Sequence, residues 1–473
     1  MFIGKDLEIS RRAFIRRSSQ LAAMGAASSY ALGLAGIGEA AAFSTGGDYK
    51  ALVCVFLYGG NDHGNTLIPF DATNYARYSA IRGGNGEAGG GIALPRASLA
   101  NTVLQAPQGQ TLTDDMTLAL APTMPRLKSL YDQGAMAPVL NVGPLLAPLT
   151  RAQYDNGSVP RPAKLFSHND QQSTWQSSQP EGSPSGWGGR MGDLALSSNT
   201  NSMFTAINAS GNAVFLSGET AVPYQVSPNG ATLFRPLRRN RLYGSSEAAS
   251  ALDTILRSGS GNVFAADHAT TNARSIEYGT FVNNALENAN LGTTFPEGNG
   301  LAAQLQAVAR LISARQSLGV TRQVFLVATG GFDNHDGLIG THEALLGGVD
   351  AALDAFYRAT VEMGIADKVT TFTASDFGRT LASNGDGSDH GWGSYHFVMG
   401  GDVAGGRFYG RAPHVSVDTA DQVGRGRLLP DISVDEYSAT LARWFGVSNS
   451  ELPTIAPNIG RFATSDLGFM NPI

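Results

Sequence analysis

Short runs of apolar residues alternate with longer stretches of helical spacing along most of the chain. The clearest apolar runs are predicted to be buried strands, over 51–57, 137–142, 323–328, 368–373 and 396–399. Apolar residues recur at helical spacing over 121–133, 246–256, 263–291, 301–318, 342–363 and 434–445. This alternation predicts an α/β fold in which an open, mostly parallel sheet carries helices on both faces.

Residues from about 163 to 230 interrupt this alternation. The stretch is rich in Ser, Asn, Gly and Gln, and its apolar runs are short. Such a composition is typical of irregular structure, so we expect a cap inserted into the α/β domain.

The first residues carry the pattern of an export signal. Arg11 and Arg12 precede an apolar pair, in an order that resembles the twin-arginine signal. Residues 21–37 form an apolar stretch of small side chains, and we expect cleavage after Ala42. A membrane anchor is the less favoured alternative, because serines and glycines break a stretch barely as long as the roughly 20 residues of a span.

We therefore expect a signal peptide over 1–42 and one domain over 43–473 that is periplasmic or secreted, with the twin-arginine translocase as its partner during export. No later segment has 18 unbroken apolar residues, which predicts no stable membrane span after cleavage.

The formal net charge is −6 with both signs interspersed, which excludes nucleic acid as a partner. The single cysteine, Cys54, lies in an apolar run, and no disulfide can form within the chain.

Acidic residues follow three of the predicted strands, and an Asp-His pair comes just before another. The carboxyl ends of parallel strands meet at one edge of a sheet, so these side chains are expected to lie together. Several carboxylates in one place repel one another, and a divalent cation makes the arrangement tolerable. The candidate metal ligands are Asp62, Asp333, His335, Asp376, Asp389 and His390.

Carboxylate and imidazole ligands suit zinc, manganese, iron or magnesium. We expect one or two divalent ions, with zinc as one candidate. Structural alternatives stay open: Asp62 and Asp376 could cap helices, and Asp333 could form a turn. Four further histidines are expected to lie on the surface or in the core: His63, His342, His396 and His414.

Seven motifs in order along the chain resemble domain-of-unknown-function family 1501. They are GGND at 59–62, NVGP at 141–144, TRAQY at 150–154, SHNDQQ at 167–172, GFDNH at 331–335, DFGRT at 376–380 and DHG at 389–391. The family is similar in its strand-end pattern to the alkaline phosphatase and sulfatase superfamily. That superfamily hydrolyses phosphate and sulfate esters with two metal ions and a Ser, Thr or modified Cys nucleophile, so the resemblance implies an alkaline phosphatase-like fold.

The resemblance also implies which residues match the metal ligands of the superfamily: Asp62, Asp333, His335, Asp376 and His390. Two departures count against a complete two-zinc centre. Phe377 stands where the superfamily has the His of an Asp-His pair, and the middle Asp and His are closer together than usual. Asp389 is a candidate to compensate.

For the nucleophile, the superfamily places a hydroxyl at a helix start, and Thr150 fits that position. Arg151 and Arg379 are then expected to stabilise charge on the phosphate or sulfate oxygens. The alternative is that Thr150 is a helix N-cap and Arg151 a surface arginine. Ser167, His168 and Gln171 belong to the family pattern and are expected to line the same mouth, without an assigned role.

The sequence thus predicts a periplasmic metal-dependent hydrolase that acts on a small anionic phosphate or sulfate ester. The alternative is a non-catalytic binding or assembly protein that keeps the fold and holds a structural ion or none; Phe377 and the insertion favour it. A Ser-His-Asp hydrolase is less favoured because no Gly-x-Ser-x-Gly motif follows a strand. Formylglycine chemistry is not expected because Cys54 lies in a strand.

Overall fold

A computed structural model describes residues 48–84, 91–211, 213–231, 235–258 and 262–472. The predicted signal peptide lies outside these residues, so export stays a prediction. Within the described residues, no helix has the length and apolar character needed to cross a membrane.

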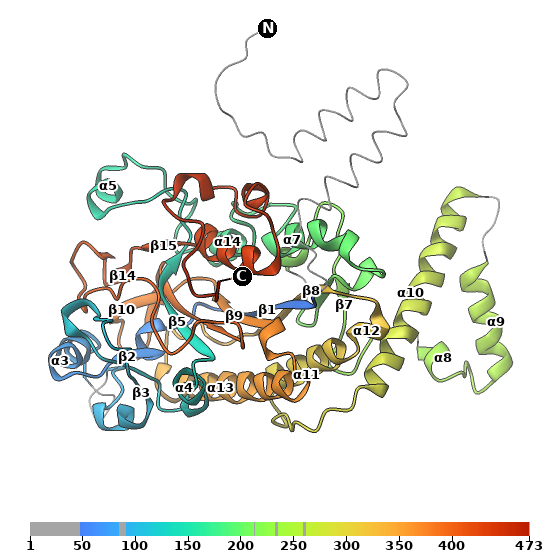
Figure 1. Ribbon diagram of the computed structural model, residues 1–473, viewed down its shortest axis with the longest axis horizontal. Coiled ribbons are helices and arrows are strands. Elements are labelled where there is room, and N and C mark those ends of the chain that lie inside the picture. The colour runs from blue at the N-terminus through green and yellow to red at the C-terminus, as the bar shows by residue number, and fades with distance from the viewer. Residues whose placement is uncertain (1–47, 85–90, 212, 232–234, 259–261, 473) are drawn as a thin grey trace, which may run out of the picture.

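An eight-stranded sheet forms the centre of the molecule (Figure 1), in the order β15-β5-β12-β9-β1-β8-β6-β7. β1 (Lys50–Leu57) lies between β8 (Arg322–Thr329) and β9 (Val369–Ser375) and is parallel to both. β6 (Ala206–Asn208) and β7 (Tyr224–Gln225) continue the parallel part beyond β8. The predicted α/β fold with a mostly parallel sheet is confirmed.

One internal strand runs against the others. β12 (Ser394–Met399) is antiparallel to β9 and to β5 (Met136–Gly143), and β15 (Ile432–Ser433) pairs parallel with β5 at the sheet edge. The amino end of β12 therefore lies at the edge where β1, β8 and β9 have their carboxyl ends. Residues just before β12 reach the same place as residues that follow the parallel strands.

Helices cover both faces of the sheet, as predicted, and alternate side chains of β1 belong to two different cores. The first core lies under α4 (Pro125–Asp132), α11 (Gly300–Ser313) and α13 (Leu338–Glu362). The second lies under α7 (Trp187–Ala195) and α14 (Val434–Phe445). Burial on both faces explains why β1 is an uninterrupted apolar run rather than an alternating one.

The segment over 163–230 is more closely integrated than the expected cap. α6 (His168–Ser177) packs against β9, α7 is buried along its whole length, and β6 and β7 belong to the central sheet. Trp175 and Trp187 are fully buried in the second core. A few large aromatic side chains thus anchor a polar stretch; its treatment as a separate insertion stays a prediction.

Within the described residues, the remaining strands form three small sheets: β2 (Leu67–Pro69), β4 (Leu118–Leu120) and β3 (Val103–Leu104); β10 (Arg379–Ser383) and β11 (Ser388–His390); and β13 (Gln422–Val423) and β14 (Arg427–Leu428). The remaining α-helices are α3 (Ala72–Ile81), α5 (Arg151–Asn156), α8 (Arg235–Arg238), α9 (Ser246–Arg257), α10 (Val263–Asn288), α12 (Arg315–Leu318) and α15 (Leu452–Ile455). α9 and α10 project from the body at the right of Figure 1.

Candidate metal centre

The loops after β1, β8 and β9 and the β10–β11 hairpin bring their polar side chains together at one edge of the sheet. Glycine makes this approach close: Gly59 has φ +114°, and a Cβ there would lie 2.4 Å from the backbone nitrogen of Asp333. The predicted ligands do not form one group, however. Asp62 is paired with a buried arginine, whereas Asp333 faces histidine rings.

Asp62 is buried, and both of its carboxylate oxygens already have protein donors. Arg82 Nη2 lies 2.8 Å from Oδ2, and the Ser388 hydroxyl donates to the same oxygen at 2.6 Å. The backbone N–H of Asn65 donates to Oδ1 at 2.9 Å, which makes Asp62 the cap of a short 3-10 turn. Burial alone would raise the pKa of Asp62, but the Arg82 guanidinium holds that pKa well below its usual range. The structural alternative for Asp62 matches this geometry.

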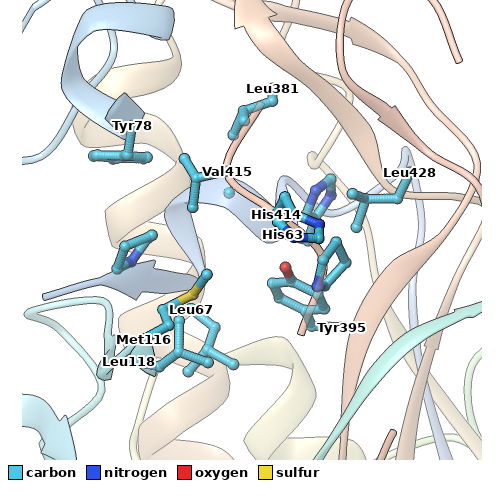
Figure 2. Close-up of a pocket in the computed structure, with 13 residues that line it drawn as sticks. His63, Leu67, Tyr78, Met116, Leu118, Leu381, Tyr395, His414, Val415 and Leu428 are labelled. Carbon is cyan, nitrogen blue, oxygen red and sulfur yellow. The ribbon is translucent and has the colours of Figure 1, made fainter. Parts of the chain in front are cut away.

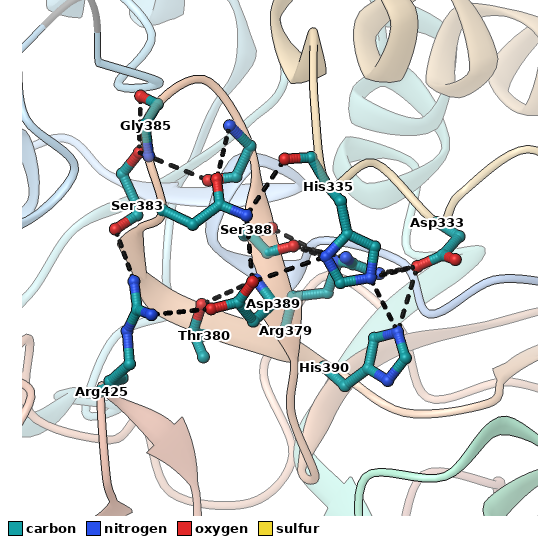
Figure 3. A network of polar contacts seen from close by, with 12 residues as sticks. Asp333, His335, Arg379, Thr380, Ser383, Gly385, Ser388, Asp389, His390 and Arg425 are labelled. Atoms are coloured by element: carbon teal, nitrogen blue, oxygen red, sulfur yellow. Dashed lines mark hydrogen bonds and ion pairs between the residues drawn. The ribbon is translucent and has the colours of Figure 1, made fainter.

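Around Asp333, by contrast, three imidazole rings converge; Figure 3 shows two of them, His335 and His390. The Nε2 atoms of His335 and His390 lie 3.1 and 3.3 Å from Oδ1 of Asp333. Nε2 of His168 lies 3.4 Å from Oδ2. Ligand atoms of His168, Asp333 and His390 all lie within 4.8 Å of one another, close enough to share a metal ion. His335 contacts Asp333 and His390 but is not part of that mutually close group. We call His168, Asp333, His335 and His390 the imidazole cluster.

The other nitrogen of each ring faces an oxygen atom. An acceptor at Nδ1 favours a proton there, and in a neutral ring of that tautomer the Nε2 lone pair faces Asp333. Metal-binding histidines are oriented in this way. The pairs are His168 with Asp376 (2.6 Å), His390 with the carbonyl oxygen of Phe166 (2.8 Å) and His335 with Asp389 (3.4 Å).

Two of these nitrogens lie close together. Nε2 of His335 lies 2.9 Å from Nε2 of His390. If both rings carry their proton on Nδ1, two lone pairs face each other, and a proton on either Nε2 or a cation bound by both nitrogens would relieve that repulsion. Burial, aided by the neighbouring positive groups, lowers the pKa of His390. Imidazole nitrogens beside a carboxylate form a donor set that fits a divalent cation.

Arg379 is fully buried and holds Asp333 in place. Its Nη1 donates to Oδ1 of Asp333 at 2.9 Å and to the carbonyl of Gly59 at 3.0 Å, while Nε and Nη2 donate to the carbonyl of Ser388. Although burial opposes it, the guanidinium lowers the pKa of Asp333. All three guanidinium nitrogens have protein acceptors, which differs from the predicted contact with a substrate oxygen; that contact remains untested.

Asp376 lies behind His168 and is completely buried. Its Oδ2 accepts from Gln172 Nε2 at 2.8 Å and from the backbone N–H of Gly59 at 3.2 Å, in addition to His168. The bond to Asp376 raises the pKa of His168. Asp376 thus orients a candidate ligand, and Asp389 stands in the same relation to His335.

Phe377 occupies the space beside the imidazole cluster. Its ring centroid lies 4.8 Å from that of His168 and 4.7 Å from that of His390. The phenyl ring gives the cluster an apolar wall at the position where the superfamily carries another imidazole.

Thr150 and Arg151 have other partners. Thr150 caps α5 in a capping box with Gln153, whose backbone N–H donates to the Thr150 hydroxyl at 3.3 Å. Arg151 pairs with Asp155 at 2.9 Å and donates to the carbonyl of Gln422. In the described part of the chain, no contact joins either residue to the imidazole cluster. The alternative of an N-cap followed by a surface arginine matches this geometry, and the catalytic assignment stays an untested prediction.

A small pocket has His63 in its wall and mostly apolar side chains around it, among them Leu67 and Met116 (Figure 2). The volume of this pocket is about 30 Å³. Its volume holds little more than a water molecule. Burial lowers the pKa of His63 and of His342 to about 4 and that of His396 to about 3. These three histidines lie in the core, as expected.

The fourth of these histidines, His414, is partly exposed and lies outside the imidazole cluster. Its Nδ1 lies 2.6 Å from a carboxylate oxygen of Asp421. The expected surface or core role of the outlying histidines therefore agrees with the geometry.

Sequence reasoning gave no role to His168 and missed Arg82, although both organise the site. His168 begins α6 rather than following a strand, and its place in the SHNDQQ motif predicted only that it lines the mouth. Arg82 directly follows α3, where nothing in the sequence distinguishes it from a surface arginine.

The family model described as protein of unknown function (DUF1501) matches residues 49–447, which include the central sheet and the whole imidazole cluster. The chain belongs to this family. No curated protein matches this DUF1501 chain.

Two solved structures illustrate what the DUF1501 chain is similar to. One is the lipoteichoic acid synthase LtaP from Listeria monocytogenes, with 10% identity, a TM-score of 0.32, and coverage of 85% of this chain and 72% of that one. The other is the PsFucS1 sulfatase from Pseudoalteromonas sp., with 11% identity, a TM-score of 0.32, and coverage of 90% and 70%. A likeness at these TM-scores assigns no function to the chain.

Proposed function

We propose that this protein is a metal-dependent hydrolase of phosphate or sulfate esters that uses one divalent cation in the imidazole cluster. The observation that carries the proposal is the convergence of three Nε2 atoms on Asp333, with each ring held from behind by an oxygen. Three imidazoles and a carboxylate suit zinc, manganese or iron. A cation held there would polarise an ester oxygen and lower the pKa of a water molecule.

A single ion, rather than two, follows from the state of Asp62. The Arg82 guanidinium is completely buried against Asp62 and supplies the positive charge that a second cation would supply in its place. Phe377 removes a further ligand. The proposed ligands are therefore His168, Asp333 and His390, with His335 as a further candidate beside them and Asp376 and Asp389 in supporting positions.

The chain's own residues prepare the site for an anionic ester. Arg379 keeps Asp333 ionised and fixed, and Asp376 fixes the ring of His168. Side chains of Asp333 and His335 are 45% and 40% exposed, so the cluster is open to a substrate from the solvent side. Phe377 closes one flank with an apolar ring, which excludes water there.

The first experiment is elemental analysis of the purified, folded protein, with turnover of an aryl phosphate and an aryl sulfate measured beside it. We expect about one ion per chain and turnover that is lost on chelation. Asp333→Asn and His168→Ala should lose the ion. His414→Ala is the matched control, because it removes a histidine that is paired with an aspartate outside the cluster.

Two results would overturn the hydrolase. One is folded protein without stoichiometric metal. The other is metal that, once removed, changes neither ester turnover nor its pH profile.

A non-catalytic protein with a structural ion is the second candidate, and the phenyl ring of Phe377 against two of the proposed ligands favours it. In that case chelation would lower the free energy of unfolding, while the parent protein would turn over neither ester.

The cellular location is proposed from the signal alone. Replacing Arg11 and Arg12 by lysine should keep the protein in the cytoplasm, as judged by cell fractionation. Unchanged export of that variant would contradict a twin-arginine route.

A further inference from the structure

A groove of about 350 Å³ runs beside α6, next to the imidazole cluster. Gln172 belongs to both places: it lines the groove and donates to Asp376, the partner of His168. His168 lies one turn before Gln172 on the same face of the helix. A ligand in the groove would thus have one end beside the proposed metal ligands.

The lining of the groove is polar but almost uncharged. One face of α6 contributes Asn169, Gln172, Ser173 and Gln176 at helical spacing, and Tyr58 faces them from the end of β1. Glu181 is the one charged residue among those that line the described groove, and Lys164 lies 3.8 Å from it. The groove therefore offers mainly amide and hydroxyl groups, with one carboxylate that is paired with Lys164.

Several of these polar groups still have hydrogen-bonding capacity. Gln172 uses its NH₂ group on Asp376, which leaves its carbonyl oxygen without a partner among the described residues. Asn169 is exposed, and its amide has no partner in the described part of the chain. Tyr58 accepts from Gln176 at 3.5 Å and keeps its own proton to donate.

This chemistry selects among ligand classes. An anion would call for arginine or lysine side chains, and none lines the groove. A lipid chain would call for an apolar lining. Amides and hydroxyls that both donate and accept match the hydroxyl groups of a sugar.

We propose that this groove binds the neutral sugar units of a carbohydrate whose phosphate or sulfate ester reaches the imidazole cluster. The substrate class rests on the proposed hydrolase function, whereas sugar binding itself does not. The volume of the groove lies at the lower end of the range for small-molecule sites, which is roughly 300–1,000 Å³. It therefore suits a few sugar units of the carbohydrate.

Saturation-transfer NMR with neutral oligosaccharides of glucose, mannose, galactose, xylose and N-acetylglucosamine tests the proposal, on the metal-containing protein and after chelation. We expect at least one oligosaccharide to bind in both forms. Asn169→Ala should weaken that binding about tenfold, and Asn169→Trp, which fills the groove, should abolish it. Asn101→Trp is the matched control, because Asn101 is also exposed but lies outside the groove.

The outcomes separate the two proposals. Oligosaccharide binding without ester turnover would support sugar binding in the groove and contradict the proposed hydrolase function. Aryl ester turnover in a protein that binds none of the oligosaccharides would overturn the sugar groove alone. Equal binding by the parent and Asn169→Trp would also overturn it, as would binding of a Ser- and Asn-rich peptide in place of every sugar.

Discussion

Asp62 and Asp333 follow neighbouring parallel strands and reach the same edge of the sheet, yet their surroundings are opposite. Asp62 is buried, and a guanidinium, a hydroxyl and a backbone N–H satisfy its oxygens. Asp333 has a side chain that is 45% exposed and faces three imidazole nitrogens. The first carboxylate is part of the structure of the protein, while the second is the one that we propose as a ligand of a cation.

The difference teaches that a strand-end carboxylate can be a metal ligand only when protein donors do not already satisfy its oxygens. A buried ion pair contributes little net stability, but removal of one partner is costly because a charge is left without compensation. Ring nitrogens that face a carboxylate have the reverse character, since a proton or a cation placed between them stabilises the contact. Sequence motifs do not distinguish these two situations.

The largest expected effect is on the buried pair. Arg82→Met leaves the Asp62 charge buried without its partner and should lower the free energy of unfolding by about 3–5 kcal/mol, measured by urea denaturation at pH 7. Arg77→Met is the control: Arg77 pairs with Asp114 on the surface, so its loss should cost about 1 kcal/mol or less. If added zinc restored the stability of Arg82→Met, Asp62 would be a ligand once freed.

The next effect is a dependence of stability on pH around Asp62. Burial lowers the pKa of His342 from 6.5 to about 4, so the folded state binds fewer protons than the unfolded state between these values. Stability should be complete above pH 6.5 and fall as the pH drops toward 4, by at most about 3 kcal/mol from this group.

His342→Gln should remove part of that slope in urea denaturation curves measured across the same pH range. His268→Gln, at an exposed histidine, should leave the slope unchanged. An identical slope in parent and His342→Gln would assign the dependence to other groups.

A smaller effect tests the shell behind the imidazole cluster. Asp376→Asn takes the carboxylate from Nδ1 of His168 and should weaken metal affinity about 10- to 100-fold, measured by competition with a chromophoric chelator. Asp421→Asn is the matched control, since Asp421 holds His414 at the same 2.6 Å. Equal affinities in both variants would exclude His168 as an oriented ligand.

The smallest effect concerns Thr150. Thr150→Ala removes the capping box and should cost about 1 kcal/mol of stability, with ester turnover unchanged. Thr150→Ser keeps the hydroxyl and serves as the control. Turnover lost in the alanine variant and kept in the serine variant would instead make Thr150 the nucleophile.

Much of the fold could be predicted from the sequence because apolar periodicity is a local signal. The terminal helix was expected over 434–445 and runs from Val434 to Phe445. The reversed direction of β12 could not be predicted, because an apolar strand has the same pattern whichever way it runs. That reversal brings His390 to the site.

The site itself was predictable only in part. Asp333, His335 and His390 lie together as their motifs indicated. The pairing of Asp62 with Arg82 and the arrival of His168 on α6 depend on tertiary packing, for which the sequence carries no local sign. The sequence does not indicate which strand-end residues are buried and which are exposed in the folded chain.

The place of β1 has a consequence for how the chain reaches this state. β1 is the first strand of the described chain, yet both its neighbours are made far later: Lys50 pairs with Arg322, and Ala51 with Val369. Until then its apolar residues have no partner strand, which exposes a sequence prone to aggregate during synthesis. Closing so long a loop also slows folding. We therefore expect the nascent chain to need a chaperone until residue 375 has left the ribosome.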